Sequence, residues 1–173
     1  MNAERNFIPL NIAVLTVSDT RTPENDTSGQ VLAARIETHG HCLHARRIVK
    51  DDKYAIRAVV SEWIADDAVQ VVISTGGTGL TGRDGTPEAV RPLFDKEIEG
   101  FGELFRALSF HDIGTSSLQS RATAGVANGT YLFVLPGSSG ACRDGWDKLI
   151  QAQLDNRTRP CNMVELMPRL LEK

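Results

Sequence analysis

The sequence predicts an α/β protein with a mostly parallel central sheet and helices on both faces. β-branched apolar segments alternate along the chain with segments whose apolar residues recur at helical spacing, and this alternation is typical of strand-helix-strand units. Segment 69–74 is almost continuously hydrophobic, as is typical of a strand buried on both faces. Asn128-Gly129, between two strand-like segments, predicts a late β-hairpin with an antiparallel edge.

The first half of the chain supplies three of the expected strands, over 11–18, 41–49 and 69–74. Each is short, apolar and bounded by polar or turn-forming residues, which favours a strand over a helix. In a parallel sheet these strands need helical connections between them. The connecting segments should therefore be helical.

Two helices are expected between these strands. Ser28 is the predicted N-cap of the first, which runs to about His39 and stops at Gly40. Asp51 and Asp52 open the second, where carboxylates complement the positive end of the helix dipole. Its apolar stripe consists of Ile56, Val59, Val60, Trp63 and Ile64.

The second half continues with helices and the hairpin. Thr86, Pro87 and Glu88 are predicted as N-cap, N1 and N2 of a helix. A further helix is expected over 103–110, the hairpin over 124–135, and a last helix from about 139 to 154. These elements complete one domain over residues 1–173, the size of an ordinary single core.

Composition excludes several classes of protein. The chain is 41% hydrophobic and 24% charged with a net charge of −3, so it is globular and lacks the overall positive field of nucleic-acid binders. No apolar run approaches the ~20 residues of a membrane span, and the N-terminus lacks the apolar core of a signal peptide. Three widely spaced cysteines suggest no disulfide framework. We expect a cytoplasmic protein without nucleic-acid or membrane partners.

Three loops are expected to meet where ligands bind in open α/β sheets, beyond the carboxyl ends of the strands. They are 18–28, 75–85 and 136–140, all rich in glycine, hydroxyl or carboxylate residues. The candidate binding residues are Ser18, Asp19, Asp26 and Ser28 from the first loop, Thr75, Gly76, Gly77, Thr78, Gly79 and Thr86 from the second and its following helix, and Pro136, Gly137 and Ser138 from the third.

The central loop predicts an oxyanion site. Its glycines let backbone N–H groups approach a phosphate closely, and the hydroxyls of Thr75 and Thr78 add donors. A simple tight connection is the alternative, but it would need far fewer glycines. Gly77, Gly79 and Gly82 match the dinucleotide-binding fingerprint in spacing. That fingerprint should open a helix directly after the first strand, whereas this loop follows the third strand and its helix starts later, so a Rossmann site is rejected. No G-K-[ST] of a Walker A loop follows.

Asp84 lies in the same loop and is a candidate Mg²⁺ ligand, because magnesium binds through one or two carboxylates plus substrate phosphates. An N-terminal dipole partner or an Asx-turn is an equal alternative. A second ligand could come from the aspartates near other strand ends, which are Asp19, Asp26, Asp51 and Asp52. The histidines at 39, 41 and 44 fit no standard zinc spacing and are interpreted as structural or surface residues.

At these loops the sequence resembles the molybdenum cofactor biosynthesis protein B (MoaB) family, and more widely the MogA and gephyrin G-domain group. The resemblance covers residues 7–162. Its motifs are TVSDTR (16–21), DTSG (26–29), STGGTGL (74–80), RDGTPEA (83–89), EGFGELFR (99–106) and LPGS (135–138), together with the MoaB-like segments 109–128 and 157–162.

The resemblance implies a three-layer α/β/α molybdopterin-binding fold and a homo-oligomer, either a trimer or a hexamer built as a dimer of trimers. In the wider group molybdopterin is adenylylated with Mg-ATP, and a MoeA-type partner protein then inserts molybdate. By motif match, Asp84 resembles the catalytic, metal-linked aspartate and Asp51 the second acidic position. The loop 76–79 would hold the pterin-side phosphate, and Ser28 and Ser138 would line neighbouring loops.

Three functions remain open on the sequence. The first is a Mg-dependent molybdopterin adenylyltransferase, in which an anionic phosphate attacks another phosphate and needs charge relief more than a general base. The second is a non-catalytic molybdopterin carrier or assembly protein. The third is an unrelated binder of a phosphate sugar or nucleotide on a similar fold.

Overall fold

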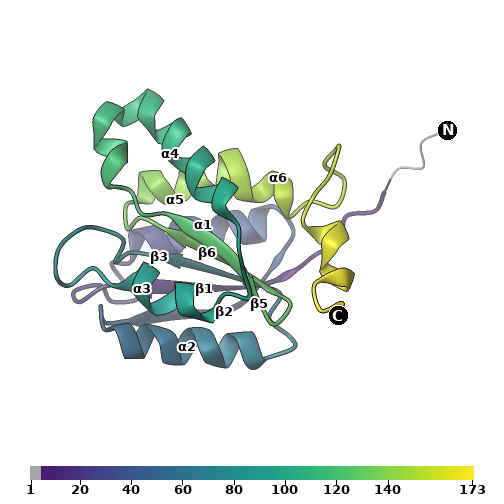
Figure 1. The fold of residues 1–173 in the computed structure, drawn as a ribbon, viewed down its shortest axis with the longest axis horizontal. Coiled ribbons are helices and arrows are strands. Elements are labelled where there is room, and N and C mark those ends of the chain that lie inside the picture. The colour runs from purple at the N-terminus through teal and green to yellow at the C-terminus, as the bar shows by residue number, and fades with distance from the viewer. Residues whose placement is uncertain (1–4) are drawn as a thin grey trace.

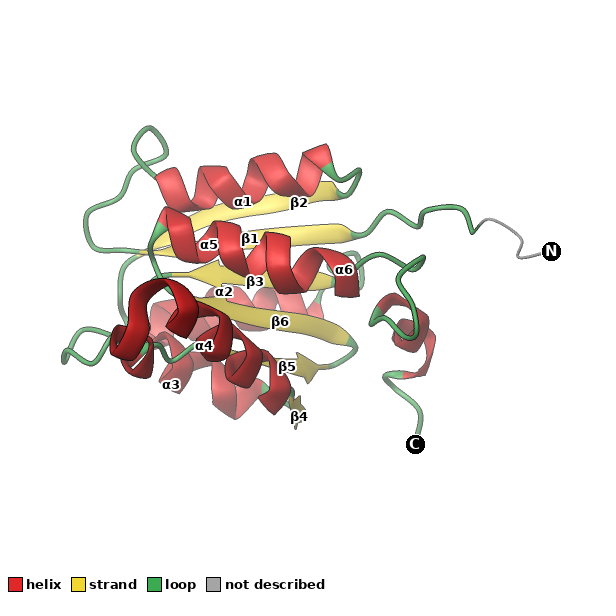
Figure 2. Cartoon of the chain, turned by 90° about the horizontal axis from the view of Figure 1, so that it is seen from above, coloured by secondary structure: helices red, strands yellow, loops and turns green. Residues whose placement is uncertain are grey.

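The computed structural model describes residues 5–173 and places six strands in one twisted sheet with helices on both sides (Figures 1 and 2). The strand order is β2-β1-β3-β6-β5-β4. In chain order the strands are β1 (Asn11–Val17), β2 (Cys42–Val49), β3 (Val71–Thr75), β4 (Lys96–Glu97), β5 (Thr123–Ala127) and β6 (Thr130–Leu135). The predicted α/β class is confirmed.

The sheet is parallel through its centre and antiparallel at one edge. β1 pairs in parallel with both β2 and β3, and β3 pairs in parallel with β6. β5 runs antiparallel to β6 and to the short β4. The predicted hairpin is present, with Asn128 at φ 48° and Gly129 at φ 81°, as a tight turn with two left-handed residues requires.

The helices are α1 (Thr27–Thr38), α2 (Lys53–Ala65), α3 (Thr86–Val90), α4 (Glu99–Ile113), α5 (Ser139–Gly145) and α6 (Gln151–Gln153). A π-helical stretch, η3 (Trp146–Ile150), joins α5 to α6, so the predicted last helix is continuous. Three 3₁₀ segments complete the set, η1 (Arg91–Leu93), η2 (Gly114–Gln119) and η4 (Val164–Arg169). No helix within residues 5–173 is long and apolar enough to cross a membrane.

Alternate residues of β1 face two separate cores. Ile12 and Val14 pack in the core beneath α1, α4 and the α5–α6 helix, whereas Ala13 and Leu15 face the core covered by α2 and α3. This period of two is what an extended strand buried on both faces requires. Figure 1 shows the resulting layers, with α2 and α3 on one side of the sheet and α1, α4 and α5 on the other.

Two predicted helix starts were wrong. Asp26, not Ser28, is the N-cap of α1, and its carboxylate accepts the Gly29 N–H at 3.0 Å. Gly85, not Thr86, precedes the first turn of α3, because the Thr86 hydroxyl is used elsewhere, on the Gly76 carbonyl. Serine and threonine are both able to cap a helix. Here the Ser28 hydroxyl is directed at Asp26, and the Thr86 hydroxyl donates to the Gly76 carbonyl.

The helix predicted over 103–110 is longer at both ends. α4 begins at Glu99, and the short strand β4 that precedes it was not predicted at all. Phe101, Gly102 and Phe105 form its buried face, while its C-terminal half stands clear of the sheet in Figure 1. The expected start of α2 at Asp52, which caps it, and the expected end of α1 before Gly40, which has φ 86°, are confirmed.

Candidate functional site

The glycine loop leaves the carboxyl end of β3 in a conformation that only glycine adopts easily. Gly76 and Gly77 have φ values of 102° and 67°, which L side chains strongly disfavour. A Cβ on Gly76 would also lie 2.2 Å from the carbonyl oxygen of Val17 at the end of β1. The loop therefore passes directly against the end of β1, and this close contact allows only glycine at position 76.

Four hydrogen bonds hold the base of this loop. The Gly76 N–H donates to the Leu135 carbonyl at 3.0 Å, and Thr86 donates its hydroxyl to Gly76 O at 2.8 Å and its N–H to Gly77 O at 2.9 Å. The Thr75 hydroxyl donates to the Pro136 carbonyl at 2.9 Å. Thr75, Gly76 and Thr86 thus build the loop, and their donors are used inside the fold.

The backbone N–H groups of the next two residues have no partner among the described residues. Within residues 5–173, neither Gly77 nor Thr78 donates its backbone N–H to any hydrogen-bond acceptor. Both residues line a cavity of about 580 Å³. Unpaired N–H groups at the wall of a cavity are the feature that an oxyanion site requires.

The cavity lies between the glycine loop, α4 with η2, and the turn before α5. Pro136, Gly137 and Ser138 line it as predicted, and the Ser138 hydroxyl also accepts the Ala141 N–H at 3.1 Å to cap α5. The residues that the sequence did not single out come mainly from α4 and η2, and they include Phe105, Ser109, Asp112, Ile113, Ser116 and Gln119. Nothing local in the sequence places that helix over the loop.

Asp84 lines the same cavity and is held by its own loop. Its carboxylate accepts the Thr81 hydroxyl at 2.6 Å and the Thr81 N–H at 2.9 Å. The Thr81 hydroxyl is the main cause of a lowered pKa of Asp84, and burial opposes it only in part. Asp84 therefore stays ionised and oriented. These two bonds from Thr81 are the Asx-like contacts expected as an alternative to metal binding. Both go to Oδ2 of Asp84, so Oδ1 has no bond to Thr81.

Asp51 lies behind the loop. A Cβ on Gly77 would be 3.0 Å from one of its carboxylate oxygens, and its Oδ1 accepts the Gly85 N–H at 3.3 Å. Burial raises the pKa of Asp51, and the negative charges of Asp84 and Asp19 raise it further. Two carboxylates that repel each other beside a phosphate-type loop are the arrangement that a divalent cation would relieve.

A third carboxylate, Asp19, connects the first loop to the second. It accepts the Asp51 N–H at 3.1 Å and binds Arg83 of the glycine loop at 2.7 Å. No cluster of three or more histidine, cysteine, aspartate or glutamate side chains within residues 5–173 is arranged to hold a metal ion. A cation here would thus depend on one or two carboxylates and on the ligand itself.

Two predicted binding residues have structural roles instead. Asp26 is fully buried, and it accepts bonds from the Thr16 hydroxyl at 2.8 Å and from Arg46 at 2.7 Å. Burial would raise its pKa, but these bonds and the Gly29 N–H outweigh it and lower the pKa. Ser28 is also buried, with its hydroxyl 3.4 Å from Asp26. Their donors and acceptors fix the start of α1.

Arg121 is a site residue that the sequence analysis missed. Its Nε donates to the carbonyls of Thr78 and Gly79, at 3.2 and 3.0 Å, and its Nη2 donates to the Asp84 carbonyl at 3.3 Å. A further bond from Nη1 reaches Glu88. Because these carbonyls point toward Arg121, it orients the loop that carries the free N–H groups. Only the three-dimensional fold brings residue 121 there.

The family model described as a probable molybdopterin binding domain matches residues 13–156. Over 156 residues the chain is 61% identical to molybdenum cofactor biosynthesis protein B of Escherichia coli (strain K12), covering 90% of this chain and 92% of that protein. The chain belongs to the molybdenum cofactor biosynthesis protein B family. The protein of that name in Bacillus subtilis (strain 168) is 48% identical over 147 residues, 84% of this chain and 86% of that one.

Solved structures show the fold of the same family. A crystal structure of molybdenum cofactor biosynthesis protein B superposes with a TM-score of 0.84 at 46% identity, covering 87% of this chain and 94% of that one. The tungsten cofactor synthesizing protein MoaB from Pyrococcus furiosus gives 0.74 at 37% identity, with 83% and 91% covered. The three-layer arrangement expected from the family resemblance is confirmed.

Proposed function

We propose that the chain binds molybdopterin in the 580 Å³ cavity, with the terminal phosphate of that ligand on the N–H groups of Gly77 and Thr78. The observation that carries the proposal is that these two N–H groups, unpaired within residues 5–173, line a cavity beside an ionised aspartate. Membership of the molybdenum cofactor biosynthesis protein B family supports molybdopterin as the ligand.

The proposed reaction is adenylylation of molybdopterin with Mg-ATP. An oxygen of the molybdopterin phosphate forms a bond to the α-phosphorus of ATP, the bond from that phosphorus to the oxygen bridging to the β-phosphorus breaks, and the electron pair leaves with pyrophosphate. The attacking oxygen is already anionic, so no proton has to be removed. The chain's task is to hold like charges together with oriented donors.

Asp84 and Asp51 are the residues that would hold Mg²⁺, because their carboxylates flank the glycine loop at Gly79 and Gly77. When bound, the ion would neutralise phosphate charge next to the reacting phosphorus. Arg121 and Thr81 keep the loop and Asp84 oriented. The repulsion that raises the pKa of Asp51 supports a cation at this place.

The proposal is tested by measuring pyrophosphate released from ATP with and without molybdopterin. We expect release that depends on molybdopterin, and a loss of at least about 100-fold in Asp84→Asn, with molybdopterin binding retained. Asp67→Asn is the matched control, since Asp67 is an exposed turn residue. Full turnover in Asp84→Asn would refute the role assigned to that carboxylate.

A non-catalytic molybdopterin carrier is the second candidate. It is favoured by the two bonds from Thr81 to Asp84, which give that aspartate a structural role in shaping the loop. A carrier would bind molybdopterin in the same cavity and release no pyrophosphate. The same assay therefore separates the two functions.

The proposal includes a homo-oligomer, a trimer or a hexamer, and a MoeA-type protein that receives the product for molybdate insertion. Exposed apolar residues near the end of α4 support self-association and include Phe110, Ile113 and Leu118. The three cysteines are free, which suits a reducing compartment such as the cytoplasm.

A further inference from the structure

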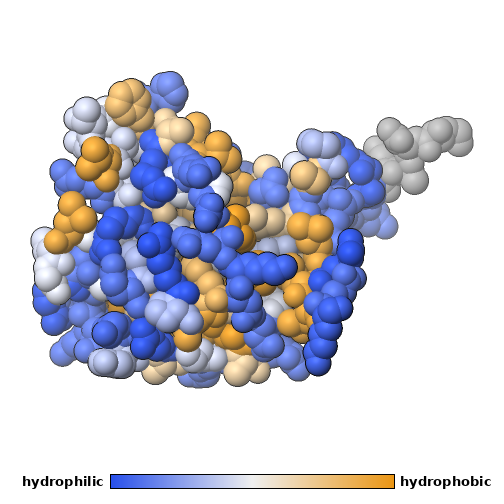
Figure 3. Space-filling model, viewed as in Figure 1, coloured by the Kyte–Doolittle hydropathy of each residue, from blue (hydrophilic) through white to orange (hydrophobic). Residues whose placement is uncertain are grey.

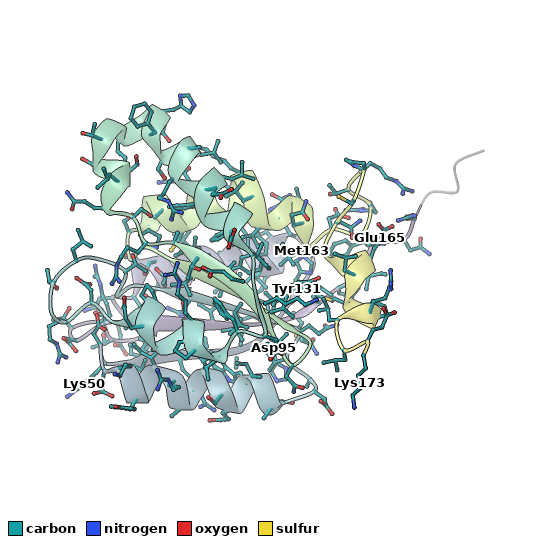
Figure 4. All side chains as sticks on the ribbon, in the orientation of Figure 1. Lys50, Asp95, Tyr131, Met163, Glu165 and Lys173 are labelled. Carbon is teal, nitrogen blue, oxygen red and sulfur yellow. The ribbon has the colours of Figure 1, made fainter. Side chains whose placement is uncertain are left out.

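A second cavity, of about 510 Å³, opens at the carboxyl ends of β1 and β2. It lies beside the first loop, and Asp19 at its wall binds Arg83 of the glycine loop. The lining residues that matter here are Ser18, Asp19, Arg21, Arg46 and Lys50. Figure 4 shows Lys50 at the end of the molecule opposite Met163 and Glu165 of the C-terminal segment.

The two cavities differ in charge. Among the described residues, the first is lined by Asp84, Asp112 and Asp144 and by no lysine or arginine. The second is lined by Arg21, Arg46 and Lys50 and a single carboxylate, Asp19. A ligand part with several negative charges would therefore favour the second cavity on electrostatic grounds.

Two of the cations that line the second cavity form no ion pair with a carboxylate of the described residues. Arg46 is neutralised by the buried Asp26, and Asp19 is neutralised by Arg83. Arg21 and Lys50 are exposed, and neither forms an ion pair with any carboxylate within residues 5–173. The wall of the cavity thus carries two positive charges outside any ion pair, and its one carboxylate, Asp19, is paired with Arg83 and feels the charge of Lys50 only at longer range.

Hydrogen bonds within the first loop hold its shape. The Ser18 hydroxyl oxygen accepts the N–H groups of Thr20 and Arg21, at 3.2 and 3.1 Å. The Arg21 guanidinium donates to the Asn25 carbonyl at 2.9 Å through one nitrogen, which leaves its other donors available. A cavity wall that is held in place beforehand loses little entropy when it binds an anion.

Asp51 connects the two cavities. Its N–H binds Asp19 in the wall of the second cavity, and its carboxylate is close enough to both Asp19 and Asp84 for each to repel it. Asp51 therefore lies between Asp84 of the first cavity and Asp19 of the second. A molecule with one end at the glycine loop could extend its other end toward Arg21 and Lys50.

We propose that the second cavity binds the β- and γ-phosphates of the nucleoside triphosphate, and then the pyrophosphate formed from them. This inference rests on the proposed adenylyl transfer. The leaving group carries the electron pair of the broken bond as added negative charge on its bridging oxygen, and Arg21 and Lys50 are the cations placed to stabilise it. The acceptor phosphate stays at Gly77 and Thr78 in the first cavity.

Calorimetric titration of the purified chain with pyrophosphate, ATP and AMP, at constant ionic strength, tests this. In Arg21→Gln/Lys50→Gln we expect pyrophosphate and ATP to bind about tenfold or more weakly, with AMP unchanged because it lacks the two terminal phosphates. Lys53→Gln is the matched control, since Lys53 is an exposed cation outside the cavity lining. Lys50→Glu alone keeps the Arg21 contact to Asn25 and should weaken pyrophosphate binding in the same direction.

Failure of this inference is distinguishable from failure of the proposed function. Pyrophosphate that does not bind the native chain, or binds the double variant equally well, would overturn the site whatever the turnover. Equal weakening of AMP would also overturn it, because the site would then hold the α-phosphate. Molybdopterin binding is measured separately, and its loss in the native chain would refute the proposed function and not this anion site.

Discussion

At the scale of single residues, His41 shows how a buried titratable group serves the fold. It is 6% exposed, its Nδ1 accepts the Leu10 N–H at 3.1 Å, and its ring packs against Phe7 and Trp146. Burial, with His39 nearby, lowers the pKa of His41 to about 4. These contacts agree with the structural interpretation of this histidine, because its ring is buried against two aromatic side chains and its Nδ1 holds the backbone of Leu10.

His41 should make the protein less stable in mild acid. In the unfolded chain the histidine has a pKa of about 6.5, so it binds a proton as the pH falls below that value. In the folded protein His41 stays neutral until about pH 4. The contribution of His41 to the free energy of unfolding is therefore fully present above about pH 6.5 and is lost as the pH drops toward 4. The expected loss from pH 7.5 to pH 5 is about 2 kcal/mol. His41→Gln, which cannot titrate, should flatten this part of the profile in urea unfolding. An unchanged profile would contradict the assignment.

At the scale of elements, Arg121 ties the start of β5 to the glycine loop. Arg121→Met keeps the apolar stem but removes all donors to Thr78, Gly79 and Asp84. We expect faster trypsin cleavage after Arg83 and molybdopterin binding weakened about tenfold, with the sheet intact by circular dichroism. Arg121→Lys should restore little of the resistance to trypsin or of the molybdopterin binding, because one ammonium group cannot replace the several donors of the planar guanidinium.

Arg91→Met is the control for Arg121. Arg91 is exposed and pairs with Glu97 at 3.1 Å, away from the loop. Its loss should leave cleavage after Arg83 unchanged. Equal loosening of the loop in both variants would show that a general loss of stability, and not the Arg121 contact, is responsible.

The hairpin between β5 and β6 offers a second test on an element. Gly129 has φ 81°, and a Cβ there would be 3.4 Å from Leu171, an ordinary contact. Gly129→Ala should cost about 1–2 kcal/mol from the left-handed backbone alone and lower Tm by roughly 3–6 °C. Asn128→Gly suits the φ of 48° but removes the bond from the Asn128 side-chain amide to the Ile64 carbonyl at 3.0 Å, so it should lower Tm less than Gly129→Ala. A Tm for Gly129→Ala equal to that of the native chain would refute this account of the turn.

The elements that the sequence predicts well are those set by neighbouring residues. Periodic apolar residues predicted β1 and α2, and the Asn128-Gly129 pair predicted the hairpin. Contacts between distant residues were not predictable. Arg121 lies 42 residues from Gly79 in sequence, and the two-residue β4 exists only because β5 is beside it.

The same distinction applies to the candidate site. Glycines of the loop after β3 and Asp84 were identified because their chemistry is local, and the structure places them at one cavity. Asp26 was misassigned as a binding residue because its partner Arg46, 20 residues away, could not be seen in the pattern. A polar residue near a strand end is thus ambiguous until its partners are known.

At the scale of the whole molecule, α4 and η2 form both a cavity wall and an exposed surface. Figure 3 shows hydrophobic residues at the surface of the part that stands out from the sheet. We call Phe110, Ile113 and Leu118 the apolar patch. They are 55%, 56% and 81% exposed, and Ile113 also lines the first cavity. Large apolar residues exposed on one protruding part of a protein are typical of an interface.

The apolar patch should mediate self-association. Leu118→Glu places a charge where burial between copies would desolvate it, so it should shift the protein to a smaller species in light scattering coupled to size exclusion. Tyr54→Glu, at an exposed aromatic residue on α2, should not change the mass of the species. Because Ile113 belongs to both the patch and the cavity, we also expect weaker molybdopterin binding by the dissociated variant. An oligomer that survives Leu118→Glu with its mass unchanged would exclude the patch as the contact surface.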